Sequence, residues 1–214
     1  MEWKYINTNG ISYIQPLNGD TDWYWGMDYT NGDLYEAEEL YQKQNSIVSN
    51  RLIFIKYPEG MIYEPIKAKK GQYLGIPVSY RKTIYCLLVD FIEEKIVIYE
   101  CSKSMDTVLI YTIIELKEVK DCYNLMLAVE PLMLIRQGHE NLFQILWPEK
   151  VSFRIDKTES FLYREGDTLI FSKWYEDPAY REEIIVREYA TGKILEHICG
   201  TLMEMSDGQK WILK

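Results

Sequence analysis

Short apolar runs follow one another along most of this 214-residue chain, and turn residues separate them. Leu52–Ile55, Ile84–Val89 and Ile184–Val186 are three examples. Side chains alternate between the two faces of a strand, and in Ile84–Val89 both faces are apolar, so both require burial. Strands buried on both faces are typical of parallel sheets covered by helices, but few segments here have helical periodicity. The pattern therefore predicts antiparallel sheets that pack against one another.

The predicted fold class is all-β, a small β-propeller-like arrangement of antiparallel sheets with four or five blades and little helix. Hairpin turns recur between the apolar runs; Tyr57–Gly60, with proline second and glycine fourth, is typical of a type I turn. Ala190–Lys193 and Ser206–Gln209 also contain glycine and predict further hairpins. The spacing is irregular and no dipeptide repeats, so a two-sheet β-sandwich or two small β domains stay as alternatives.

One segment, Asp33–Lys43, has the pattern of a helix. Asp33 and Glu36 have the spacing of a capping box, with aspartate in place of serine or threonine. Leu34, Ala37 and Leu40 then fall on one helical face. The same residues can also run as a strand, so the segment predicts a helix with a strand as the alternative.

No linker or abrupt change in composition divides the chain, which predicts a single domain over residues 1–214. Met1–Asp20 lacks the continuous apolar centre of a secretory leader, and no apolar run approaches the roughly 20 residues of a membrane helix. We therefore expect a soluble, cytoplasmic protein without membrane association. The four cysteines form no CxxC pair and lie in or beside apolar runs, which predicts buried free thiols.

The formal net charge is −9, so the chain as a whole repels a phosphate backbone. Lys67, Lys69 and Lys70 form the densest basic segment, and they are too few to suggest a nucleic-acid site. An acidic surface instead suits a basic protein partner.

Motifs of the common enzyme classes are absent from the sequence. There is no GxGxxG and no P-loop, so no cofactor is expected, and no GxSxG sequence supports a serine triad. His139 and His197 are the only histidines, which argues against a zinc centre. The segment Asp28–Asp33 approaches a calcium loop but misplaces its oxygen ligands. The sequence predicts no metal site, and a role other than catalysis is favoured.

The richest candidate site is Asp22–Glu39, where aromatic rings alternate with carboxylates. A ring can stack on the apolar face of a sugar while carboxylates at its rim accept hydroxyl hydrogen bonds. A second aromatic cluster surrounds Trp174. The other interpretation is structural, with rings in the core and carboxylates on a solvated helix face. The predicted ligand-binding residues are Asp22, Trp23, Trp25, Asp28, Glu36, Glu38, Trp174 and Tyr175.

These features together favour a non-catalytic binding module that takes a protein or carbohydrate ligand through an acidic, aromatic-rich face. The alternative function is a glycan-acting hydrolase, which needs two carboxylates facing one cleft. Asp22, Asp28, Glu36 and Glu38 are its candidate pair members. The sequence specifies neither the ligand nor the oligomeric state.

Overall fold

The computed structural model describes residues 3–205 and 209–214, and the chain divides into two compact units, Met1–Leu127 and Ala128–Lys214. The described residues form nineteen strands and one α-helix. The predicted turn Ser206–Gln209 lies largely outside them, since residues 206–208 are not described. The prediction of a single domain stays a prediction, because two compact units can belong to one domain.

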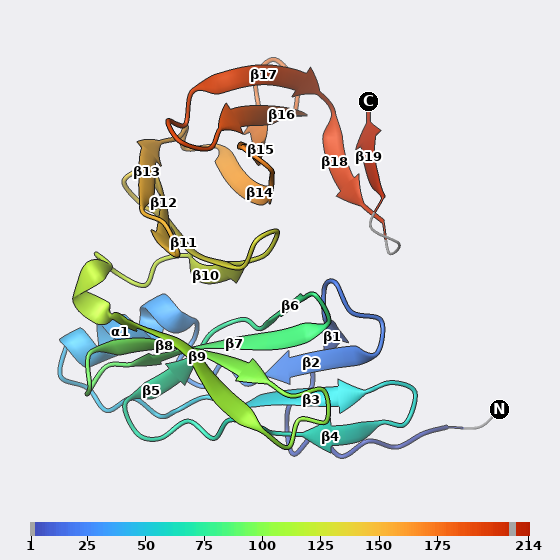
Figure 1. The fold of residues 1–214 in the computed structure, drawn as a ribbon, viewed down its shortest axis with the longest axis vertical. Coiled ribbons are helices and arrows are strands. Elements are labelled where there is room, and N and C mark those ends of the chain that lie inside the picture. Colours follow the sequence, from blue (N-terminus) through green and yellow to red (C-terminus); the bar gives the residue numbers. More distant parts are fainter. Residues whose placement is uncertain (1–2, 206–208) are drawn as a thin grey trace. The chain divides into compact units, whose positions relative to one another are not determined.

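The first unit contains two antiparallel sheets and the helix (Figure 1). One sheet has the strand order β1 (Gln15–Pro16), β2 (Trp23–Met27), β3 (Leu52–Lys56), β4 (Met61–Tyr63). The other has the order β5 (Gln72–Leu74), β7 (Thr83–Asp90), β8 (Lys95–Cys101), β9 (Val108–Glu115), with β6 (Val78–Tyr80) also paired to β7. Helix α1 (Leu34–Gln42) connects β2 to β3, and a 3₁₀ turn, η1 (Leu116–Glu118), follows β9.

Strand β7 is buried on both faces, as its sequence predicts. Ile84, Cys86 and Leu88 belong to an apolar cluster of the first unit, together with residues of β2 and β3. Leu87 and Val89 point to the other face and are fully buried as well. At about 25 cal/mol per Å² of apolar surface, burial on both sides makes this strand a major source of stability.

The second unit has the same up-and-down order of strands. One sheet runs β10 (Leu125–Ala128), β11 (Met133–Gly138), β12 (Leu142–Trp147), β13 (Val151–Arg154), and the boundary between the units falls within β10. The next runs β14 (Glu159–Glu165), β15 (Thr168–Tyr175), β16 (Arg181–Glu188), β17 (Ile194–Cys199). The hairpin β18 (Thr201–Glu204) and β19 (Lys210–Leu213) ends the chain.

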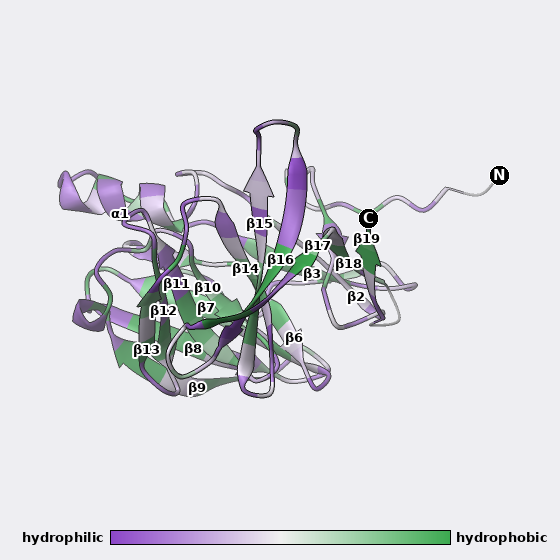
Figure 2. Ribbon diagram, turned by 90° about the horizontal axis from the view of Figure 1, so that it is seen from above, coloured by the Kyte–Doolittle hydropathy of each residue, from purple (hydrophilic) through white to green (hydrophobic). Residues whose placement is uncertain are grey.

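The core of the second unit contains a cluster of phenylalanine rings. Phe143 stacks on Phe161 with ring centroids 5.0 Å apart, and it meets Phe171 edge-on at 5.1 Å. Strand β16 enters this core part-way along its length: its charged first residues are partly exposed, and Ile184 and Ile185 are buried. Figure 2 shows the corresponding change from hydrophilic to hydrophobic along β16.

The structure confirms the predicted fold class. The chain is all-β with little helix, and its antiparallel sheets have the consecutive strand order of β-propeller blades. The predicted helix is also confirmed as α1, and both hydrogen bonds of the Asp33–Glu36 capping box are present. In the described part of the chain, neither helical segment has the length and apolar character that crossing a bilayer requires.

The cysteine prediction is correct at three positions and wrong at one. Cys86, Cys101 and Cys122 are free and buried, whereas Cys199 is free and exposed. Cys199 is the last residue of the edge strand β17, which among the described residues pairs only with β16, so part of its surface stays open to solvent.

Candidate functional site

Trp23 and Trp25 lie in the core of the first unit. Their exposed fractions are 6% and 4%, and the Trp23 ring meets Tyr63 edge-on with ring centroids 5.4 Å apart. Both rings point to the same face of β2 because they are two residues apart in a strand. Neither ring is open to a ligand in this structure.

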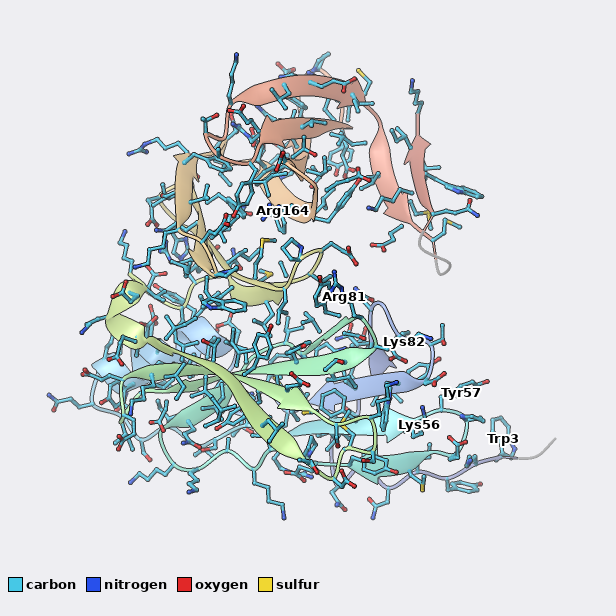
Figure 3. All side chains as sticks on the ribbon, viewed as in Figure 1. Trp3, Lys56, Tyr57, Arg81, Lys82 and Arg164 are labelled. Atoms are coloured by element: carbon cyan, nitrogen blue, oxygen red, sulfur yellow. The ribbon has the colours of Figure 1, made fainter. Side chains whose placement is uncertain are left out.

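Asp22 precedes β2 and is exposed. Its Oδ2 lies 3.0 Å from the Lys56 Nζ, and this hydrogen bond, followed by the lysine charge, lowers the pKa of the Asp22 carboxyl. Lys82, in the turn between β6 and β7, adds a smaller effect of the same sign. Figure 3 labels Lys56 and Lys82. Asp22 therefore belongs to a mixed-charge surface at the ends of β3 and β6.

Asp28 and Glu36 support the loop that leads from β2 into α1. The Asp28 carboxylate accepts hydrogen bonds from the Arg51 backbone N–H at 2.9 Å and from the Thr30 hydroxyl at 3.1 Å. The Glu36 carboxylate accepts from the Asp33 N–H at 2.7 Å, while the Asp33 carboxylate accepts from the Glu36 N–H at 2.9 Å. Each carboxylate thus has a local structural role.

Glu38 is buried, with 7% of its surface exposed. Its Oε2 accepts a hydrogen bond from the Cys122 backbone N–H at 2.6 Å. This bond joins α1 to the segment that follows η1, 84 residues further along the chain. A buried carboxylate needs such donors, because burial without them costs several kcal/mol.

A pocket of about 110 Å³ opens beside the start of α1, within the first unit. Its apolar lining residues are Met27, Leu34, Leu74, Ile76, Leu125 and Met126. Its other lining residues are Tyr29, Asp33, Tyr35, Tyr73, Gly75, Cys122 and Asn124. The predicted segment Asp22–Glu39 thus contributes five residues to this pocket, although none of the five is among the predicted ligand-binding residues.

Tyr73 lines the pocket and also contacts the loop between β2 and α1. Its hydroxyl donates to the Gly32 carbonyl at 2.7 Å and accepts from the Asn31 N–H at 3.3 Å. Burial is the main reason why its pKa rises to about 12; the Asn31 hydrogen bond opposes the rise, and the charges of Asp28, Asp33 and Glu36 add to it. These three carboxylates therefore lie near enough to Tyr73 to act on its hydroxyl, and Asp33 itself lines the pocket.

Trp174 and Tyr175 lie in the second unit at the end of β15, on opposite faces of the sheet. The Tyr175 hydroxyl donates to Glu183 Oε2 at 2.9 Å, and His197 Nδ1 lies 3.2 Å from the same oxygen. The Arg181 guanidinium covers the Tyr175 ring at 4.2 Å from its centroid. Tyr175 is thus part of a polar cluster, while Trp174 is 39% exposed.

Sequence reasoning did not identify Tyr73, Glu183 or the apolar lining of the pocket. Tyr73 lies 41 residues from its acceptor Gly32, and Glu183 meets His197 through strand pairing. No local motif signals such contacts. Among residues 3–205 and 209–214, no group of three or more His, Cys, Asp or Glu side chains is arranged to hold a metal ion.

Comparison with protein-family models finds no match to this chain, and comparison with curated proteins finds none either.

Proposed function

We propose that this protein is a non-catalytic binding module, and that its first unit takes a basic peptide segment of a protein partner. The observation that carries the proposal is the pocket beside α1, which combines an apolar lining with surrounding carboxylates. Such a combination suits a segment in which lysine or arginine residues flank one apolar side chain.

The size and lining of the pocket support an apolar side chain as its occupant. Its volume of about 110 Å³ is below the roughly 150 Å³ of a cavity that holds benzene, so a leucine, isoleucine or methionine side chain suits it best. Ile76 and Tyr29 are 48% and 52% exposed, and they give an entering side chain apolar surface to cover. The gain is about 0.8 kcal/mol for each buried CH₂ group.

The polar groups of the pocket support a peptide over a sugar. A sugar requires donors and acceptors aimed at its hydroxyls. The Asp33 carboxylate already accepts from the Glu36 N–H, and the Tyr73 hydroxyl already donates to Gly32. Asp28 and Glu36 are similarly engaged in the loop, which also weakens the glycan-hydrolase alternative.

Charge supports a basic partner. Asp28, Asp33 and Glu36 act together on Tyr73, and the chain carries a net charge of −9. Long-range attraction of a cationic peptide raises its association rate, and added salt screens that attraction. The affinity should therefore fall as salt rises.

The test is selection from a random linear peptide library displayed on phage, followed by calorimetry with the synthetic peptides. Wild type should enrich peptides with basic residues around one aliphatic residue. Ile76→Trp, which fills the pocket, and Tyr29→Ala, which removes an exposed wall, should each weaken binding by about tenfold or more. Tyr5→Ala is the matched control, because Tyr5 is 92% exposed and does not line the pocket.

Two results would overturn the proposal. One is a selected peptide whose affinity is the same in wild type and in Ile76→Trp. The other is the absence of any enriched peptide, together with a glycan on an array that binds wild type and is lost in Tyr29→Ala. The second result would assign the same surface to carbohydrate.

A further inference from the structure

Strand β9 forms an open edge of its sheet. It is the last strand in the order β5-β7-β8-β9, so the described residues pair with it only on its β8 side (Figure 1). Over its eight residues, Leu109 is 60% exposed, Ile110 58% and Ile113 48%. Apolar side chains of this size rarely stay exposed together along one strand of a monomer.

The sequence of β9 lacks the usual protection of a sheet edge. Edge strands in native proteins are commonly short, or carry lysine, proline or an inward-pointing charge. Residues 108–114 contain no charged residue, no proline and no glycine, and Glu115 ends the strand. A bulge near Tyr111 is the one irregularity, and pairing with β8 continues on both sides of it.

Other outer strands of the same protein differ from β9. Strand β4 has three residues, and β13 has four and ends in Arg154. Strand β17 is six residues long and carries Glu196 and His197. The length and apolar character of β9 therefore set it apart from these edges.

We propose that β9 is the interface through which two copies of this chain associate, with their β9 strands paired antiparallel about a two-fold axis. In such a pair apolar residues lie opposite apolar residues, and Glu115 falls near Val108 of the other strand and not opposite a second Glu115. Residues 108–114 carry no charge and so offer no attraction to a basic partner. They do let two chains of net charge −9 approach without a local like-charge contact.

The available surface agrees with a reversible dimer. The surface that β9 offers comes from one eight-residue strand, and interfaces below about 1,000 Å² in total are typical of weak association. We therefore expect dissociation in the micromolar range. Added salt should strengthen the dimer by screening the repulsion between two acidic chains, the opposite of its effect on a basic peptide.

The first test is sedimentation velocity of the full chain across micromolar concentrations. Wild type should shift from 25.5 kDa to twice that mass as its concentration rises. Ile110→Lys, which places a charge in the middle of the edge, should weaken the dimer at least tenfold. Leu195→Lys is the matched control, because Leu195 is 52% exposed on the edge strand β17, and it should leave the dimer unchanged.

Amide hydrogen exchange of wild type gives a second test that needs no variant. At high concentration the amides of residues 108–115 should exchange more slowly than at low concentration, while those of β17 should not change. A chain that stays monomeric at every concentration would overturn the proposal. A dimer that Ile110→Lys leaves intact, with protection elsewhere, would overturn it as well.

Discussion

The Arg187 guanidinium and the Glu159 carboxylate form a bidentate ion pair, in which Nε and Nη2 each lie 2.9 Å from a carboxylate oxygen. The two side chains are only 9% and 2% exposed. Arg187 also donates to the Gly192 carbonyl, so the pair joins β14, β16 and the turn that follows β16.

Removing one partner of this pair should destabilise the protein strongly. Glu159→Ala leaves the Arg187 charge buried without its carboxylate, and we expect a loss of about 3–5 kcal/mol in the free energy of unfolding. Urea denaturation measures this loss. Glu39→Ala removes the exposed partner of Lys43 and should cost much less, because solvent screens an exposed ion pair. Equal losses in both variants would contradict the prediction.

Gly192 and Gly166 form a second matched pair. Both have positive φ angles, +71° and +56°, so alanine strains the backbone at either position by about 1–2 kcal/mol. An added Cβ at Gly192 would also collide with the Phe153 ring, whereas nothing lies within 4 Å of one at Gly166. Gly192→Ala should therefore lower the unfolding free energy by a further ~1–3 kcal/mol, measured by urea denaturation.

The Glu183 carboxyl predicts a dependence of stability on pH. The hydrogen bond to His197 is the main reason why the pKa of Glu183 lies below its ordinary value of 4.5. The folded state therefore favours the charged form, and its contribution to stability is complete above pH 4.5 and is lost as pH falls through the folded-state pKa. Glu183→Gln should make the urea midpoint less sensitive to acid.

Glu182→Gln provides the control for that experiment. Glu182 lies on the same strand, on the opposite face, where it accepts a hydrogen bond from the Tyr180 hydroxyl. The urea midpoint of Glu182→Gln should differ between about pH 6 and about pH 3.5 by as much as the midpoint of wild type does. If Glu183→Gln also leaves that difference unchanged, the carboxyl does not contribute to acid sensitivity.

The four thiols should react in two classes. Cys199 is exposed and should react quickly with Ellman's reagent. The other three cysteines are buried and should react only when the protein unfolds. Cys86 Sγ lies 3.9 Å from Cys101 Sγ, and their hydrogen bond together with burial raises the pKa of the Cys86 thiol. Cys199→Ser should abolish the fast phase. A fast phase of two or more thiols in wild type would contradict this assignment.

Local patterns predicted the elements of this fold well. The continuous apolar run Ile84–Val89 predicted a strand buried on both faces, and β7 is one. The spacing of Asp33 and Glu36 anticipated the start of α1, because a capping box involves only residues within one helical turn.

The candidate site was harder to predict, because burial depends on contacts that are distant in sequence. Trp23 and Tyr29 have similar local surroundings, yet Trp23 packs in the core and Tyr29 is 52% exposed at the pocket. Likewise, the hydrogen bonds that join Tyr73 to Asn31 and Gly32 link residues about 40 positions apart, so no local pattern predicts them. Aromatic content locates a region rich in packing, but it does not tell which ring faces solvent.

The buried bond from the Cys122 N–H to Glu38 has a consequence for how the first unit matures on the ribosome. Until residue 122 has emerged, the Glu38 carboxylate lacks this donor and α1 cannot close over its final neighbours. Leu125 and Met126, which complete the pocket lining, emerge later still. A nascent chain shorter than this therefore has neither the buried partner of Glu38 nor the complete lining of the pocket, even though the whole helix has already been synthesised.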